Sequence, residues 1–166
     1  MSYAYDLIIV GAGPAGIFTA LELLRKSARP QELKILLIEK GKPVERRHCP
    51  KAETGHCGGE LPELIGEEFA QDLIDYTDKI YLEFGADPHV EGVYEGAEIK
   101  EIRKRSIQAG LQLVDCPIRH LGTERAQQLY LNIQRYLQDA GVEMWFETEC
   151  DNILLEGDAC RGVIAR

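Results

Sequence analysis

Two short apolar runs near the start of the chain predict strands that are buried on both faces. The first run is Tyr5–Val10 (YDLIIV) and the second is Leu33–Glu39 (LKILLIE). Between them, Arg29 and Pro30 end a predicted helix. The helix is indicated by apolar residues at helical spacing: Ile17, Ala20, Leu21 and Leu24. Strand, helix and strand in this order predict a βαβ unit with a right-handed crossover.

The middle of the chain alternates loops with predicted helices. Residues 40–59 are loop-like because glycine and proline recur in them. Helices are predicted over residues 66–84 and 97–109, and a strand over residues 111–116 is stopped by Pro117. The expected apolar faces are Phe69, Leu73, Tyr76, Ile80 and Phe84 on the first helix, and Ile99, Ile102 and Ile107 on the second.

The last third of the chain predicts one helix followed by strands. The predicted elements are a helix over residues 122–140 and strands over residues 142–147, 150–155 and 160–165. The apolar stripe of the helix is Ala126, Leu129, Ile133, Tyr136, Leu137 and Ala140. Gly141 stands where a helix commonly ends on a glycine. Gly157–Asp158 separates the last two strands and predicts a hairpin turn.

Charge and composition narrow the class of protein. The chain has 166 residues, with 19 basic and 28 acidic side chains and a net charge of −9. This balance argues against nucleic-acid binding, which needs a basic face, and against binding to anionic membrane surfaces. Hydrophobic residues make up 45% and charged residues 28%, which is typical of a globular domain.

Cysteine usage indicates a reducing compartment. The five cysteines are odd in number and show no disulfide framework. We see no signal peptide and no run of about 20 apolar residues that would span a membrane. The sequence therefore predicts a cytoplasmic protein.

The glycine turn after the first strand carries the candidate chemistry. Gly11 permits a tight turn, Gly13 lets a pyrophosphate approach the backbone, and Gly16 lets the helix lie close to the sheet. Pro14 stands near the first helical position, where its missing N–H costs nothing. The free N–H groups and positive dipole end of the helix then favour a diphosphate.

Glu39 completes a dinucleotide-binding pattern. It ends the second predicted strand, where its carboxylate can accept hydrogen bonds from both hydroxyls of an adenosine ribose. The same negative charge disfavours a 2′-phosphate and therefore NADP at this site. The alternative is a glycine turn that merely connects strand and helix. The position of both strands and of Glu39 favours the dinucleotide interpretation.

Other polar residues give weaker signals. Arg46 and Arg47 either fold back over a diphosphate or lie in a solvated loop. A metal or redox site is not favoured for His48, Cys49, His56 and Cys57, because neither a CxxC pair nor a zinc-ligand spacing is present. A further group precedes the helix near residue 122: Arg119, His120 and Gly122–Thr123. These residues either face a cofactor or substrate, or Thr123 caps the helix and His120 is a partly exposed histidine, and both alternatives stay open. Arg103–Lys104–Arg105 is expected on a solvated helix face.

The sequence resembles a known enzyme family. YDLIIVGAGPAGIFTALELL followed by LKILLIEKGK resembles the start of FAD-dependent oxidoreductases with the glutathione-reductase-type flavin fold. RRHCP, GGELPELIG, YLEFGAD and PIRHLGTE resemble a narrower group, the FAD-utilising dehydrogenases of bacteria and archaea. The first similarity covers about 40 residues, and the second is scattered over the middle of the chain.

The resemblance implies a fold and a domain organisation. The fold class is α/β, a Rossmann-like FAD/NAD(P)-binding βαβ unit with a helical excursion and a β-meander. Residues 1–40 and 122–166 would form the flavin-binding core and residues 41–121 the excursion. The chain would be the N-terminal portion of a larger enzyme, ending within the meander, with a shortened loop at Cys57–Gly58.

The resemblance also implies FAD as the cofactor, with NAD(P)H left open as electron donor or acceptor. The residues expected at the ADP half of FAD are Gly11, Gly13, Pro14, Ala15, Gly16, Glu39, Lys40, Arg47 and, through its backbone, Cys150. Neither a catalytic residue nor a metal is assigned. A small-molecule substrate is expected, and a homo-oligomer is left open. The alternatives are an NAD-binding dehydrogenase or regulatory domain and a non-catalytic nucleotide-binding fragment. The chain by itself is expected to bind FAD weakly and to self-associate.

Overall fold

A parallel sheet of three strands organises the two ends of the chain. The computed structural model describes residues 4–46, 66–113, 119 and 123–166, and these belong to two units. The sheet unit comprises Met1–Gly59 and Gln127–Arg166, and the helical unit comprises Glu60–Ala126. The division at residues 41 and 121 that the sequence suggested stays a prediction.

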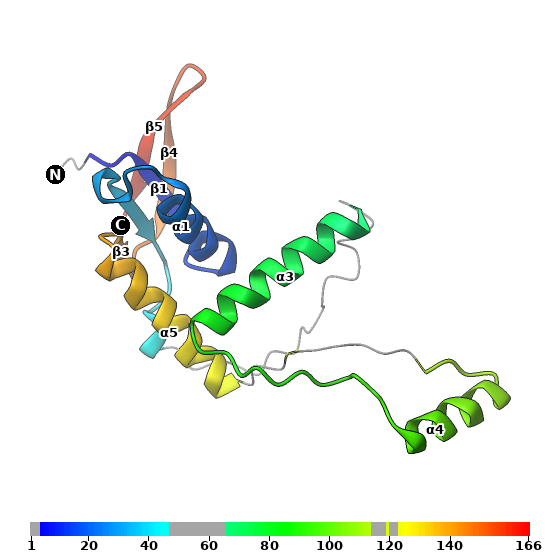
Figure 1. Ribbon diagram of the computed structural model, residues 1–166. Helices are drawn as coiled ribbons and strands as arrows, with labels where there is room; N and C mark the ends of the chain where they lie inside the picture. Colours follow the sequence, from blue (N-terminus) through cyan, green and yellow to red (C-terminus); the bar gives the residue numbers. More distant parts are fainter. Residues whose placement is uncertain (1–3, 47–65, 114–118, 120–122) are drawn as a thin grey trace. The chain divides into compact units, whose positions relative to one another are not determined.

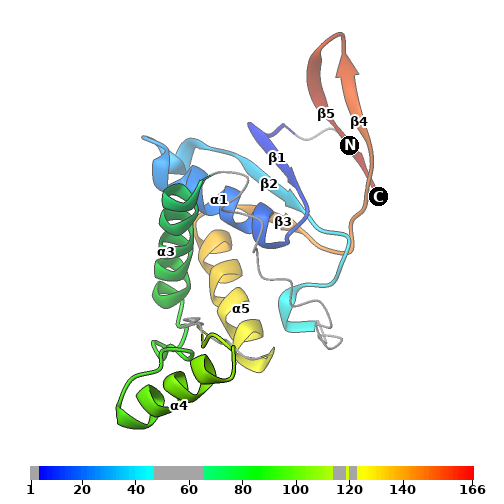
Figure 2. The same cartoon turned by 90° about the vertical axis from the view of Figure 1, so that its right-hand side faces the viewer.

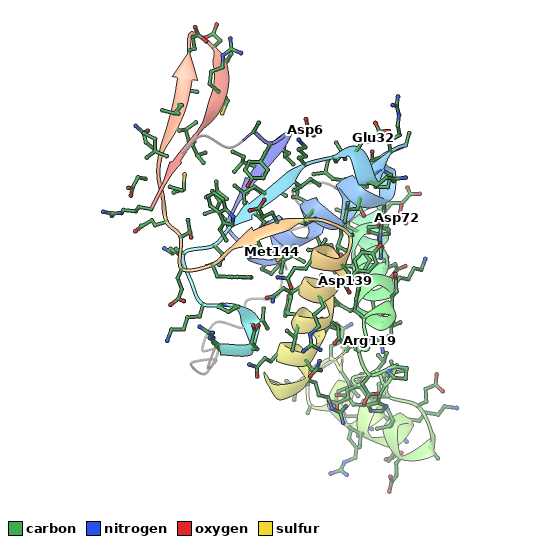
Figure 3. The ribbon with its side chains drawn as sticks, turned by 90° about the vertical axis from the view of Figure 1, so that its left-hand side faces the viewer. Asp6, Glu32, Asp72, Arg119, Asp139 and Met144 are labelled. Atoms are coloured by element: carbon green, nitrogen blue, oxygen red, sulfur yellow. The ribbon has the colours of Figure 1, made fainter. Side chains whose placement is uncertain are left out.

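The strands of the sheet follow the order β1-β2-β3. They are β1 (Leu7–Val10), β2 (Ile35–Ile38) and β3 (Glu143–Trp145), with Leu7 opposite Ile35 and Leu36 opposite Glu143. The predicted strands were longer, but their centres are confirmed. Asp6, at the start of β1, fixes the pairing: its carboxylate accepts a hydrogen bond from the Lys34 amide at 2.9 Å (Figure 3).

Burial of the strands follows this order. All four residues of β2 are at most 2% exposed, as expected for the central strand. The expectation that β1 is buried on both faces is wrong, since Leu7 is 37% and Val10 is 55% exposed. The reason is position, because β1 lies at the edge of the three-stranded sheet and has one neighbour.

Two helices pack on the sheet, α1 (Pro14–Lys26) and α5 (Thr123–Asp139). Figure 2 shows α1 and the later part of α5 on one side of the three strands. Their predicted stripes are largely confirmed, but Tyr136 on α5 and Ala140 directly after it are exposed. The buried side chains are Ile17, Ala20, Leu21 and Leu24 on α1, and Leu129, Ile133 and Leu137 on α5.

Helix α1 ends earlier than Pro30 suggested. Its last residue is Lys26, and Ser27 takes an extended conformation while its N–H still donates to the Leu23 carbonyl. Pro30–Glu32 then forms a separate 3-10 turn, η1. The chain thus leaves the helix before the residues that proline restricts, and the basic Arg25 and Lys26 lie favourably at the helix carboxyl end.

The helical unit contains α3 (Glu67–Glu83) and α4 (Ala97–Gln108), both predicted from the sequence (Figure 1). Their expected apolar faces are mostly not buried. Ile80 is 1% exposed, but the following residues are at least 38% exposed: Phe69, Leu73, Tyr76, Ile102 and Ile107. Periodicity identified the helices correctly, whereas burial depends on a partner surface that periodicity does not specify.

Three helices end in the same way, on a glycine in the left-handed region. Gly85, Gly110 and Gly141 follow α3, α4 and α5 with φ of 102°, 74° and 91°. After α5, the Val142 amide donates to the Leu137 carbonyl at 2.9 Å and the Gly141 amide to the Gln138 carbonyl at 3.0 Å. This pair of bonds is a Schellman motif, and it confirms the predicted role of Gly141.

The prediction of a strand over residues 111–116 is wrong for residues 111–113, which the structure describes. Residues 111–113 form no strand, and residues 114–116 lie outside the described part of the chain. The amide of Leu111 donates to the Ser106 carbonyl at 2.8 Å, so it completes the end of α4 instead of a ladder.

The predicted hairpin is confirmed. Strands β4 (Cys150–Glu156) and β5 (Ala159–Ala165) pair antiparallel around Gly157–Asp158, and Gly157 has a φ of 60°. The Glu149 amide donates to the Arg166 carbonyl at 2.7 Å and the reverse bond measures 3.0 Å. Exposed apolar side chains cover much of this ribbon: Ile153, Leu154, Leu155 and Ile164.

Candidate functional site

The glycine turn joins β1 to α1 at the carboxyl edge of the sheet. Gly11 has a φ of 103°, and its amide donates to the Ile38 carbonyl at 2.7 Å. A Cβ atom on Gly16 would lie 1.9 Å from the Gly11 carbonyl oxygen and 3.2 Å from a side-chain carbon of Ile9. The turn therefore needs glycine at position 11 for its conformation and at position 16 for close contact between helix and strand.

The amino end of α1 is open. Gly13, Pro14 and Ala15 are exposed, and no side chain in the described part of the chain caps this end or places an acid in its first turn. A Cβ atom on Gly13 would meet no heavy atom within 4 Å. Backbone N–H groups and the positive end of the helix dipole thus face free space, an arrangement that suits an anion such as a diphosphate.

Glu39 lies directly after β2, and its carboxylate binds both the glycine turn and the loop that follows β2. One carboxylate oxygen accepts a hydrogen bond from the Ala12 amide at 2.7 Å, and the other accepts from the Gly41 amide at 2.7 Å. The residue is half-buried. The sequence predicted a ribose-binding carboxylate here, and the structure adds two backbone partners that sequence reasoning missed.

The chain after β3 wraps around the same residue. The Glu39 amide donates to the Trp145 carbonyl at 2.8 Å, and the Thr148 amide donates to the Glu39 carbonyl at 3.0 Å. Glu147 donates to the Gly41 carbonyl at 3.0 Å and is the non-glycine residue with a positive φ, 52°, in the described part of the chain. The parallel register of β2 and β3 brings these residues together, and no local sequence signal marks them.

The structure describes two further residues that the sequence predicted at the cofactor site, Lys40 and Cys150. Lys40 is exposed and follows Glu39 directly. Cys150 is half-buried, begins β4 and is a free thiol. Arg47 lies outside the described residues, as do His48, Cys49, His56 and Cys57, so the predictions for them stay predictions.

Glutamines of α5 hold the start of the loop that leads to Arg47. Val44–Arg46 forms a short 3-10 helix, η2. Gln134 is 4% exposed; its carbonyl accepts from the Val44 amide at 3.3 Å, and its amide donates to Glu45 at 3.4 Å. Gln127 donates to the Val44 carbonyl at 3.0 Å. Sequence reasoning missed both glutamines, although their place beside the apolar stripe of α5 was a usable signal.

Arg119 has protein partners in the helical unit, where Figure 3 labels it. Its guanidinium binds Asp78 through two nitrogen atoms, at 2.6 and 2.9 Å, and donates to the Asp87 carbonyl at 2.7 Å. Asp87 in turn pairs with Arg125. Of the two roles left open for Arg119, this geometry supports a structural one, while His120 lies outside the described residues.

The ion pairs shift the acidity of their members. The hydrogen bond from Arg119 lowers the pKa of Asp78 below 3.8, against an opposing effect of burial. The backbone amide of His89 and then Arg125 lower the pKa of Asp87 in the same direction. The bond to Asp78 raises the pKa of Arg119. Both carboxylates therefore stay ionised near neutral pH.

A hollow lies at the edge of the sheet opposite the glycine turn. It is lined at the amino ends of the strands by residues that include Tyr5, Lys34 and Glu143. The Glu143 carboxylate accepts from the Tyr5 hydroxyl at 2.8 Å and from the Trp145 indole at 2.7 Å. This hollow contains none of the predicted site residues.

Within its described residues the chain has neither a cluster of metal-ligating side chains nor a membrane-spanning helix. Among them, no group of three or more histidine, cysteine, aspartate or glutamate side chains could hold a metal ion. Within the same ranges, no helix combines the length and apolar character needed to cross a membrane.

Comparison with known proteins agrees with the geometry of the turn. Residues 8–57, which include most of β1 and all of α1, β2 and Glu39, match the FAD-NAD(P)-binding family. No curated protein matches the chain. The matched segment thus contains the glycine turn and the acidic residue after β2.

Solved structures share the fold over nearly all of the chain. L-proline dehydrogenase from P. horikoshii is 14% identical with a TM-score of 0.56, and the match covers 99% of this chain and 50% of that one. Glycine oxidase from Bacillus cereus is 15% identical with a TM-score of 0.51, covering 98% and 53%. A flavocytochrome c3 fumarate reductase is 13% identical with a TM-score of 0.54, covering 99% and 30%.

These similarities confirm the predicted α/β fold with a Rossmann-like FAD/NAD(P)-binding βαβ unit. The chain spans about half or less of the length of the structures it matches.

Proposed function

We propose that this chain is the FAD-binding portion of a flavin-dependent oxidoreductase. The observation that carries the proposal is the open amino end of α1 next to the Glu39 carboxylate, within a segment that matches the FAD-NAD(P)-binding family. In this arrangement the turn Gly11–Gly16 holds the diphosphate and Glu39 accepts the ribose hydroxyls. The flavin ring would supply the hydride chemistry, and the chain supplies binding and orientation.

The individual ligand roles belong to the proposal. Gly13, Pro14 and Ala15 leave room for the diphosphate because they are exposed and uncapped. Lys40 and Arg47 supply positive charge beside it, and the backbone of Cys150 meets the adenine. Glu39 disfavours a 2′-phosphate at this position.

FAD is favoured over NAD by the organisation of the chain. Between β2 and α5 lie more than 80 residues, including α3 and α4, whereas a simple NAD-binding unit needs a short connection there. NAD(P)H enters the proposal as an electron donor or acceptor for the flavin.

The proposal extends to the setting of the enzyme. The substrate is a small molecule. The odd number of cysteines without a disulfide pattern supports a location in the cytoplasm.

Binding experiments on the full chain test the cofactor. Calorimetric titrations with FAD, NAD and ADP should show weak but measurable binding of FAD and ADP. Tighter binding of NAD than of FAD would favour an NAD-binding domain, and absence of binding by all three would contradict the proposal.

Gly13→Val tests the site itself. Gly13 has φ −73° and ψ 178°, which valine adopts without strain, and a Cβ atom there meets no heavy atom within 4 Å. The branched side chain would instead occupy the space of the diphosphate, so we expect a folded protein that loses FAD binding. Ala159→Val, at an exposed position of β5, is the control and should bind FAD normally. Normal flavin loading of Gly13→Val would contradict the assignment.

A further inference from the structure

Glu39 is bonded within the chain through every polar group it has. Its amide and carbonyl pair with Trp145 and Thr148, and its two carboxylate oxygens pair with the amides of Ala12 and Gly41. Ala12 is the residue between the two glycines that begin the turn, and it is 6% exposed. One side chain therefore joins the glycine turn after β1 to the loop after β2.

We infer that the Glu39 carboxylate is a positioning group that holds the glycine turn in the conformation that receives a diphosphate. This inference rests on the proposed function and adds a second role for the residue, distinct from contact with the ribose. The two roles are compatible, because a carboxylate offers about four acceptor positions and the two amides occupy two of them.

The chemistry of the two partners explains why a carboxylate is required. Both are N–H donors, so the bridging group must present two acceptor atoms. A glutamine offers one acceptor oxygen and one NH₂ group, which would face an N–H. The half-buried Glu39 and the buried Ala12 leave little access for water to replace the lost bond.

The positioning role and a ribose role predict different results for Glu39→Gln. A glutamine amide can still exchange hydrogen bonds with a ribose hydroxyl, so a role limited to the ribose predicts a small loss of ADP affinity and no change for a ligand without ribose. A positioning role predicts weaker binding of inorganic pyrophosphate, which contacts the turn and lacks the ribose.

The first measurement needs no nucleotide. In the full chain labelled with ¹⁵N, amide hydrogen exchange at Ala12 and Gly41 should become roughly tenfold faster at one or both sites in Glu39→Gln than in the wild-type chain. Glu101→Gln, an exposed position on α4 in the helical unit, is the matched control and should leave both rates unchanged. Unchanged exchange at both amides of Glu39→Gln would overturn the inference.

The second measurement is a pyrophosphate titration of the same proteins, followed through the amide signals of Ala12 and Gly13. We expect Glu39→Gln to bind inorganic pyrophosphate roughly tenfold more weakly than Glu101→Gln at a temperature where both are folded. Equal pyrophosphate affinity with reduced ADP affinity would show a ribose contact alone and overturn the inference. Failure of the wild-type chain to bind FAD would contradict the proposed function and leave the exchange result standing.

Glu39→Asp provides a second variant should the glutamine protein fail to fold. Aspartate keeps two acceptor oxygens on a side chain that is one methylene shorter, so it cannot span both amides from the same backbone position. We expect faster exchange at one of the two amides and protection at the other. Wild-type exchange at both amides in Glu39→Asp would overturn the inference.

Discussion

Gly13 and Gly16 lie in the same turn but have different physical requirements. A Cβ atom on Gly16 would lie 1.9 Å from the backbone oxygen of Gly11, whereas one on Gly13 would meet nothing within 4 Å. Gly13 also has an ordinary, negative φ of −73°. The protein therefore needs glycine at position 16 for the close contact between α1 and the end of β1. The glycine at position 13 is not needed for packing, and it leaves space in front of the backbone for a ligand.

This difference predicts that two matched substitutions change the free energy of unfolding by different amounts. Gly16→Ala should lower the free energy of unfolding by about 1–3 kcal/mol, because α1 must move away from the end of β1. Gly13→Ala should change it by less than about 1 kcal/mol. Chemical denaturation of both variants measures the difference. Equal stability of the two proteins would contradict the close contact at Gly16.

At the scale of elements, α5 does more than cover the sheet. Its buried Gln134 accepts a hydrogen bond from the Val44 amide, and Gln127 donates to the Val44 carbonyl. The helix thereby holds η2, the last described segment before Arg47. The position of η2 depends on α5, which lies about 90 residues further along the chain.

Gln134→Leu tests this attachment. The substitution leaves the buried Val44 amide without its side-chain acceptor, so we expect a loss of about 1–3 kcal/mol in the free energy of unfolding. Gln138→Leu, at an exposed position of the same helix, should change stability by less than about 0.5 kcal/mol. Thermal and chemical denaturation of the two variants give the comparison, and similar losses in both would refute the attachment.

The ion pairs of the helical unit predict an acid-sensitive element. The pKa values of Asp78 and Asp87 are lowered from 3.8, so both groups contribute stability above that pH. Their contribution is lost as the pH falls through the lowered values, because protonation removes the charge that Arg119 and Arg125 bind. Stability from these pairs is therefore constant near neutral pH and declines below about pH 4.

Arg119→Met separates this contribution from general acid denaturation. Loss of the arginine removes the main cause of the lowered Asp78 pKa. The variant should be less stable than the wild type at pH 7, and the difference should shrink as the pH falls below about 4. Arg105→Met, at an exposed position of α4, is the control. Melting curves between pH 3 and pH 7 test this, and a difference that stays constant over the range would contradict it.

At the scale of the whole molecule, exposed apolar surface stands out in the sheet unit. Val10 at the sheet edge is 55% exposed, and Ile153 and Leu155 on the hairpin are 55% and 68% exposed. A two-stranded ribbon is marginally stable alone, and an unpaired strand edge readily pairs with another chain. Strand β2 adds nothing to this exposed surface, since all four of its residues are buried between neighbours.

We therefore expect the 166-residue chain to self-associate with increasing concentration. Sedimentation velocity of the purified chain should show species larger than the monomer of 18.6 kDa. Replacement of Ile153 and Leu155 by threonine keeps residues that favour strands and removes apolar surface, so it should shift the distribution toward monomer. A wild-type chain that stays monomeric at all concentrations would contradict this prediction.

The sequence by itself determined the features that depend on neighbours along the chain. The period of apolar residues located the helices and strands, and the glycines at positions 11 and 141 marked a turn and a helix end that need positive φ. The acidic residue at the end of the second strand was also visible. These features are local because a backbone conformation is set by the residues that adopt it.

The tertiary structure alone decided which distant groups meet. The Ala12 amide lies 27 residues from Glu39, and Asp78 lies 41 residues from Arg119. The exposure of β1 and of the α3 stripe likewise depended on strand order and on partner surfaces. A pattern along the chain records that a side chain is apolar or charged, but burial and pairing are properties of two surfaces, and the second surface is chosen only by the fold.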